Sequence, residues 1–185
     1  MIFLSEILDF FEPIEKIKRK EREGWKIAKK EYKIKGVVET IGSHSLGAAL
    51  IGWFLAEKEG LNKEKIIKLL LVHDLVMAYM HDITPRDKDY ARKKEIENDN
   101  IKELLKDIPS ILKNEFESLI MEYQKEETPE SRLAREADKM DTLLQAFFYS
   151  KENGRKEIIQ DFLPRYEKFF RSKTGMKIFM ELKPL

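Results

Sequence analysis

The sequence contains no cysteine. This absence excludes disulfides, thiolate nucleophiles and zinc or iron–sulfur sites held by cysteine. It is also typical of a reducing compartment, and we expect a cytoplasmic protein. Any metal site would have to be built from nitrogen and oxygen ligands.

The sequence also lacks an excess of charge of either sign. Lys and Arg number 35 and Asp and Glu number 34, which leaves a formal net charge of +1. This balance gives no reason to expect a nucleic acid or a membrane as partner. Long hydrophobic runs are missing too. The longest, "LGAALIGWFLA" (46–56), is well short of the roughly 20 residues that span a bilayer, so it predicts a buried helix.

No stretch shows the strict alternation of a half-buried strand, whereas helical periodicity covers nearly the whole chain. We expect one all-α domain over residues 1–185, a bundle of roughly six to eight helices. Pro13 is expected to break the first helix, Ser43 and Asn62 to cap the helices that follow them, Gly60 to end one helix and Pro129 to begin another. The expected helices cover about 3–12, the stretch from Pro13 to Lys33, 43–59, 62–82, 87–107, 109–124, 130–151 and 155–171, with a short tail helix.

Imidazoles and carboxylates lie beside core-facing stripes on three of these helices. His44 begins one helix, His73 and Asp74 lie on the next, and Asp138 adjoins an apolar stripe on a later one. A buried carboxylate costs several kcal/mol unless it is paired or bound to a cation, which favours a mixed nitrogen–oxygen metal site between the helices. The alternative is that His73 is a core histidine satisfied by one hydrogen bond.

These residues, in this order, resemble the pattern of the HD-domain metal-dependent phosphohydrolases. Within that superfamily the chain looks most like the 5′-deoxynucleotidase branch, which includes oxetanocin-like proteins. The resemblance covers about residues 24–150, and we expect the helices of 155–185 to pack on this part. It is carried by Gly24-Trp25, "VVETIGSHS" (37–45), "LLVHDLVMAYMHDIT" (70–84) and "EYQKEETPESRLAREADKMDTLLQAFFY" (122–149).

The resemblance implies an enzyme that hydrolyses deoxyribonucleoside 5′-monophosphates, as a homodimer. It implies one divalent ion (Mn, Co, Ni, Fe, Zn or Mg) held between the central helices by His44, His73, Asp74 and Asp138. Asp74 could also protonate the leaving oxygen. An HD hydrolase of another nucleotide class is an alternative, although a chain of 185 residues has little room for further phosphate-binding clusters.

The resemblance also suggests substrate contacts. Trp25 would lie on the phosphate side and Asp82 would face the sugar, although Asp82 could equally cap a helix end. Glu39 could position its loop or orient a ligand, or it could be a solvated carboxylate. His81 could carry a proton, or it could be a surface histidine.

One departure from the family pattern concerns chemistry. The branch has a glutamate four residues after the motif histidine, and this chain has Met77 there. A thioether cannot move a proton. The alternative function is therefore a protein that binds metal and nucleotide but hydrolyses weakly or not at all.

The sequence offers one candidate for a dimer contact, the apolar face of the N-terminal helix, and this face could equally belong to the core. Its residues are Phe3, Leu4, Ile7, Leu8, Phe10 and Phe11.

Overall fold

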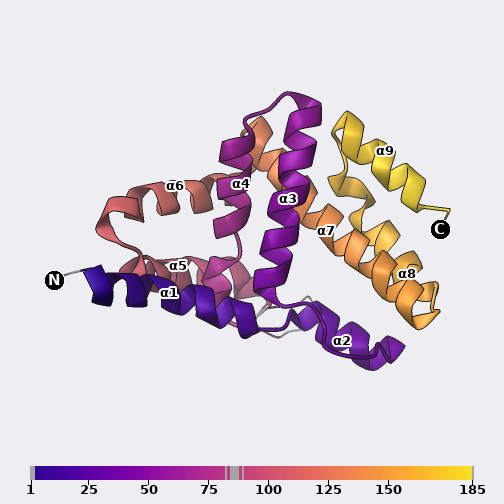
Figure 1. The fold of residues 1–185 in the computed structure, drawn as a ribbon, viewed down its shortest axis with the longest axis horizontal. Coiled ribbons are helices and arrows are strands. Elements are labelled where there is room, and N and C mark those ends of the chain that lie inside the picture. Colours follow the sequence, from indigo (N-terminus) through magenta and orange to yellow (C-terminus); the bar gives the residue numbers. More distant parts are fainter. Residues whose placement is uncertain (1–2, 82, 84–87, 89, 185) are drawn as a thin grey trace.

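A computed structural model describes residues 3–81, 83, 88 and 90–184, and in this part of the chain it has nine α-helices and no named strand (Figure 1). The all-α fold class is confirmed. None of the described helices is long and apolar enough to cross a membrane. The α-helices are α1 (Phe3–Arg19), α2 (Glu23–Tyr32), α3 (Ile41–Glu59), α4 (Lys63–Val72), α5 (Lys93–Asp107), α6 (Ser110–Lys125), α7 (Pro129–Asn153), α8 (Glu157–Tyr166) and α9 (Lys173–Leu182).

Helix α3 lies at the centre of the molecule, where it packs against α4 and α7 (Figure 1). Buried residues of α1, α3, α4, α5, α6 and α7 form one hydrophobic cluster. A second cluster joins α2, α8 and α9 to the C-terminal half of α7. Since α7 contributes to both clusters, its middle turns lie where they meet.

The predicted break at Pro13 is wrong, because α1 runs through this residue to Arg19. A proline inside a helix costs about 3 kcal/mol. Pro13 and Ile17 are nevertheless the buried residues of α1, and α1 packs against α3 and α5. Tertiary packing thus outweighs the local penalty. The chain breaks instead at residues 20–22, where Glu21 forms an isolated β-bridge with Thr40.

Helix α3 begins earlier than predicted, because Thr40 and not Ser43 is its N-cap. The Thr40 hydroxyl accepts from the Ser43 backbone N–H, and the Ser43 hydroxyl in turn accepts from the Thr40 backbone N–H, so the two form a capping box. His44 consequently lies inside the first turns of α3, where it is fully buried.

The helix expected over 62–82 is shorter than predicted. Asn62 caps it as expected, but α4 ends at Val72 and a 3₁₀ turn, η1 (Leu75–Ala78), follows. Lys20 donates to the backbone carbonyls of Met77 and Met80, which holds the end of this turn against the α1–α2 junction. His73 and Asp74 therefore lie between two helical segments.

The predicted boundaries at Gly60 and Pro129 are confirmed. Gly60 ends α3 with a positive φ angle of 70°. Helix α7, expected to end near residue 151, runs to Asn153 and is followed by Gly154 with a φ of 62°. Pro129 lies in the first turn of α7, after a capping box between Thr128 and Ser131.

Helix α3 lies close to α4 at Gly52. A Cβ atom there would overlap the Leu70 side chain and lie 2.9 Å from Ile66 Cγ2. Both neighbours are fully buried. We expect Gly52→Ala to lower the free energy of unfolding by about 1–3 kcal/mol, measured by urea denaturation.

Gly24→Ala is the matched control, since a Cβ atom there meets nothing within 4 Å. It should leave stability unchanged or raise it slightly, because alanine restricts the unfolded chain. Equal stability of the two variants would show that α3 and α4 are not in close contact at Gly52.

Candidate metal centre

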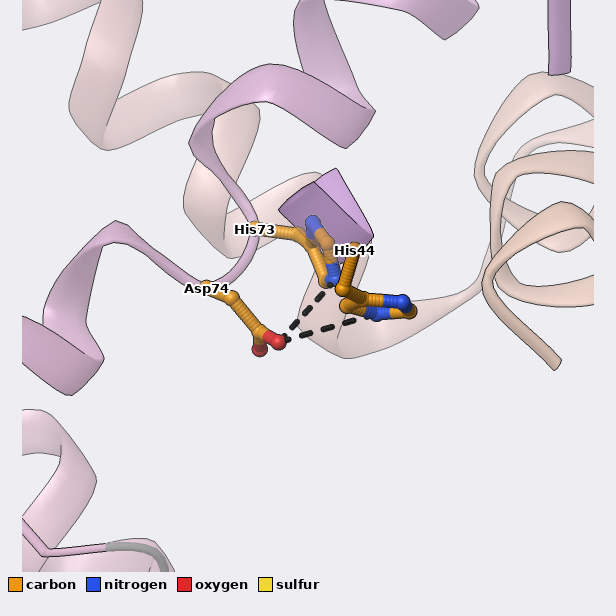
Figure 2. A group of neighbouring side chains, drawn as sticks. All are labelled: His44, His73 and Asp74. Atoms are coloured by element: carbon orange, nitrogen blue, oxygen red, sulfur yellow. Dashed lines mark ion pairs between the residues drawn. The ribbon is translucent and has the colours of Figure 1, made fainter. Parts of the chain in front are cut away.

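Three helices bring the predicted ligands together. His44 comes from the start of α3, His73 and Asp74 directly follow α4, and Asp138 comes from the middle of α7. His44 Nε2 lies 3.3 Å from Asp138 Oδ1 and 3.8 Å from Asp74 Oδ2, and His73 Nε2 lies 3.4 Å from Asp74 Oδ2. Figure 2 shows both imidazoles directed toward the Asp74 carboxylate.

The tautomer of His44 is set by its other ring nitrogen. His44 Nδ1 lies 2.6 Å from Asp141 Oδ2, and a carboxylate can only accept. In neutral His44 the proton therefore lies on Nδ1, and Nε2 carries a free electron pair. Such a carboxylate–histidine contact is the usual support of a metal-bound histidine.

His73 is arranged in the same way. Its Nδ1 lies 2.7 Å from the backbone carbonyl of Leu70, so Nδ1–H donates and Nε2 is again the atom with the electron pair. The Nε2 atoms of both histidines are buried and have no hydrogen-bond partner. A buried polar atom without a partner requires an explanation, and a metal ion supplies one.

The donor atoms of His44, His73 and Asp74 all lie within 4.8 Å of one another, so these three residues can share one ion. Atoms bound at about 2.1 Å from a metal lie roughly 3.0–3.4 Å apart at octahedral or tetrahedral angles. The nearest N–O distances, 3.3 and 3.4 Å, fall in this range. Imidazole together with carboxylate suits a divalent transition ion. The residues present therefore fit the metal that the sequence implies.

Asp138 is held by groups that leave one of its oxygens directed at His44. Its Oδ2 accepts from the Tyr123 hydroxyl at 2.7 Å and pairs with Lys139 Nζ at 2.9 Å. Burial alone would raise the pKa of Asp138, but Lys139 and His44 outweigh it and hold the pKa well below its usual range. Asp138 is therefore ionised and ready to bind a cation.

Nearby carboxylates likewise favour the protonated, positively charged form of His44. Burial and nearby Arg22 would lower the pKa of His44, but Asp138 and Asp141 raise it to about 9. Burial would raise the pKa of Asp74, and the adjacent His73 and His44 lower it instead. The cluster thus attracts a cation. A metal ion bound there would take the place of the proton on His44 Nε2, while the proton on Nδ1 stays.

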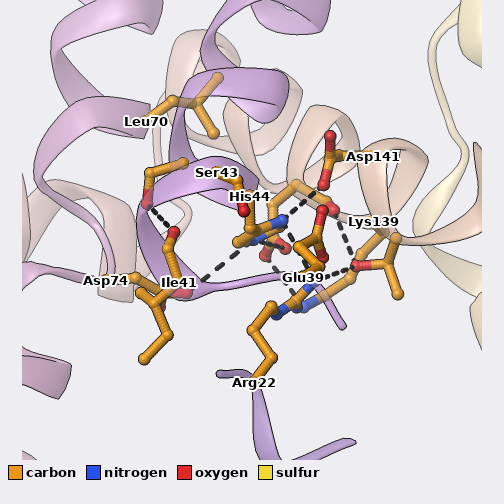
Figure 3. Close-up of polar contacts among 12 residues, drawn as sticks. Arg22, Glu39, Ile41, Ser43, His44, Leu70, Asp74, Lys139 and Asp141 are labelled. Atoms are coloured by element: carbon orange, nitrogen blue, oxygen red, sulfur yellow. Dashed lines mark hydrogen bonds and ion pairs between the residues drawn. The ribbon is translucent and has the colours of Figure 1, made fainter. Parts of the chain in front are cut away.

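A second polar network lies beside the ligands (Figure 3). Arg22 donates to Glu39 Oε2 at 2.9 Å and to Thr142 Oγ1 at 3.2 Å, and its guanidinium lies 3.1 Å from His44 Nδ1. The Trp25 indole N–H donates to the same Glu39 oxygen at 2.9 Å. Burial raises the pKa of Glu39, and Arg22 opposes that rise. Glu39 therefore fixes Arg22 and Trp25 next to the metal centre.

A cavity of about 200 Å³ opens beside the cluster. Positive, acidic and apolar side chains all contribute to its wall. The lining residues are Arg22, Ile41, His73, Asp74, Val76, Met77, Glu97, Ile120, Tyr123, Gln124, Arg135, Asp138 and Lys139. Three cations next to a metal centre suit an anionic group such as a phosphate.

The residues expected to contact the substrate differ in their exposure. Trp25 is only 2% exposed and stacks on Phe162 with the ring centroids 4.8 Å apart, so it reaches the site through Glu39. His81 is exposed. Asp82 lies outside the described residues. The substrate roles of these residues remain predictions.

Four residues of the site were not among the predicted ones. Arg22 lies in the α1–α2 junction, where local sequence gives no signal of its neighbours. Tyr123, Arg135 and Asp141 surround Asp138 and His44. The sequence did point to Arg135 and Asp141, because each is three positions from Asp138 and residues three apart on a helix lie on the same face.

Comparison with known proteins decides the family. A family model described as HD domain matches residues 14–175 of the chain. The chain belongs to the HD domain family. A Dictyostelium discoideum protein named 5′-deoxynucleotidase HDDC2 is 32% identical over 162 residues, which is 83% of each chain. The human protein of that name is 26% identical over 157 residues, 84% of this chain and 74% of the human one.

Solved structures agree with this HD fold. A conserved hypothetical protein from Pyrococcus furiosus has a TM-score of 0.76 and 30% identity, covering 96% of this chain and 99% of its own. A protein from Magnetospirillum magnetotacticum, described as a predicted metal-dependent phosphohydrolase, has a TM-score of 0.71 and 25% identity, covering 97% and 90%.

The contact between Asp141 and His44 depends on a glycine in α3. A Cβ atom at Gly47 would overlap the Asp141 carboxylate that holds His44. We expect Gly47→Ala to displace Asp141 and weaken Mn²⁺ binding by roughly 10- to 100-fold, measured by isothermal titration calorimetry.

Phe54→Ala is the control on the same helix, since Phe54 is 51% exposed. Its Mn²⁺ affinity should equal that of the unchanged protein. If Gly47→Ala also binds Mn²⁺ normally, the His44–Asp141 contact does not support the metal centre.

Proposed function

We propose that this protein hydrolyses deoxyribonucleoside 5′-monophosphates to nucleoside and phosphate. The observation that carries this proposal is the pair of partnerless imidazole nitrogens beside a cavity that three cationic side chains line. The names of the HD relatives support the substrate class.

The ligands would be His44, His73, Asp74 and Asp138. A divalent ion bound by them supplies charge to a phosphate oxygen and lowers the pKa of a water molecule. Mixed imidazole and carboxylate ligands suit Mn, Co, Ni, Fe or Zn more than Mg.

Arg22, Arg135 and Lys139 would hold the remaining phosphate oxygens. Each of these cations already has a carboxylate partner, in Glu39, Glu126 and Asp138 respectively. These partners keep the side chains in place before substrate binds, which lowers the entropy that binding costs. They also offset part of the positive charge, so the cavity suits one phosphate group better than a triphosphate.

Apolar side chains would separate the reaction from bulk water. Ile41, Val76, Met77 and Ile120 line the cavity, and all four are buried. An apolar wall excludes water and lowers the local dielectric constant, which strengthens the attraction between the phosphate and the cations.

We further propose a cytoplasmic homodimer. Five of the six apolar residues named on the N-terminal helix are exposed, and only Phe10 packs on the core. Leu46, Leu50 and Trp53 form a second exposed row on α3, at 59%, 57% and 49%. Exposed apolar surface of this kind is typical of protein contacts.

The test of the activity uses Asp74→Asn. Purified protein is incubated with each deoxyribonucleoside 5′-monophosphate and Mn²⁺ or Co²⁺, and released phosphate is measured. The unchanged protein should release phosphate, and Asp74→Asn should lose both bound metal and activity because a neutral amide is a poor ligand.

Metal content is measured on the same samples. Equal metal and an equal rate in Asp74→Asn would refute the site. Stoichiometric metal without phosphate release from any of these substrates would refute the proposed activity and favour a nucleotide-binding protein.

A further inference from the structure

The cavity lacks a proton carrier at the position where the family has one. Met77 lines the cavity and is buried, and its thioether holds no transferable proton. Hydrolysis of a phosphate ester leaves an alkoxide on the 5′-oxygen, and a proton delivered to that oxygen speeds the reaction by roughly 10²- to 10⁴-fold. Under the proposed function, another group must supply this proton.

Three carboxylates line the cavity in the described part of the chain: Asp74, Glu97 and Asp138. Asp74 and Asp138 lie within 3.8 Å of His44 Nε2, where a metal ion would occupy their oxygens. Glu97 is the remaining one. It comes from α5, which packs against η1, the turn that carries Met77.

The other polar groups of the cavity are poorly suited to proton transfer. Tyr123 already donates its hydroxyl proton to Asp138, and burial raises the pKa of Tyr123 further. Lys139 is paired with Asp138, and the two arginines stay protonated. The amide of Gln124 does not titrate in this range.

We propose that Glu97 replaces the missing glutamate and is the catalytic proton donor of this protein, an inference that rests on the proposed function. As the water oxygen bonds to phosphorus, the bond between phosphorus and the 5′-oxygen breaks. The Glu97 carboxyl group gives its proton to the 5′-oxygen, and the nucleoside leaves as an alcohol. The proton of the attacking water passes to solvent, and the Glu97 carboxylate takes a proton from solvent, which restores the acid.

This position follows from the packing of α5. Glu97 is half-buried and lines the cavity, whereas Asp99 on the same helix is exposed. The two acids therefore differ in their access to the cavity, although they lie only two residues apart.

The experiment compares Glu97→Gln with Asp99→Asn in the full-length, Mn²⁺-loaded protein. For each variant kcat and KM are measured on a deoxyribonucleoside 5′-monophosphate, and Mn²⁺ affinity is measured by calorimetry. Glu97→Gln should lower kcat by about 10²-fold or more, with KM and Mn²⁺ affinity within about 2-fold of the unchanged protein. Asp99→Asn should change none of the three.

A double variant tests whether a carboxylate in this cavity is what the reaction needs. Met77→Glu places one at the family position, so Met77→Glu combined with Glu97→Gln should recover most of the lost kcat. A variant that fails to fold would be recognised by its thermal unfolding curve, and Glu97→Gln alone then decides the question.

The outcomes separate the two proposals. If the unchanged protein is active and Glu97→Gln keeps its full kcat, Glu97 is not the proton donor and the proposed function stands. A loss of Mn²⁺ affinity in Glu97→Gln would overturn the proposal by making Glu97 a ligand. If the unchanged protein binds Mn²⁺ but releases no phosphate from any substrate, both proposals are overturned.

Discussion

The contact between His44 and Asp141 joins α3 to α7 and decides which nitrogen of His44 faces the metal position. With the proton of neutral His44 on Nδ1, the Nε2 atom is left with a free electron pair between Asp74 and Asp138. Gly47 makes this contact possible, since a side chain there would occupy the place of the Asp141 carboxylate. The packing of two helices and the chemistry of the site therefore depend on the same few atoms.

The site gathers charges that would destabilise an ordinary core. Asp138, Asp141 and Glu39 have little exposure, and each is placed against a cation, an imidazole or both. Buried ion pairs seldom add net stability, because desolvation offsets most of their attraction. We infer that this cluster is retained for binding and costs the fold some stability. The two hydrophobic clusters, to which successive parts of α7 contribute, supply the stability that the site does not.

Local sequence was sufficient for most of the fold, and the family resemblance named the residues of the candidate metal centre. Helical periodicity, turn-forming glycines and the cap at Asn62 depend on neighbours within a few residues, so they can be predicted without a structure. His44, His73 and Asp138 drew attention because polar groups beside core-facing stripes are costly unless they are paired or bound to a cation, and the resemblance then implied their role as ligands. Where tertiary packing overrode local preference the prediction was wrong, as at Pro13, where α1 continues because its buried face packs on α3 and α5.

The sequence by itself determined an all-helical chain and the residue types able to bind a metal ion. Only the tertiary structure decided which other side chains surround them. Arg22 is 22 residues from His44 and Asp141 is 97, and no local rule connects groups so far apart. The place of Glu97 at the cavity was set in the same way, by the packing of α5 against η1. Contacts of this kind depend on how helices cross, and that is fixed by the complementary shapes of their buried faces.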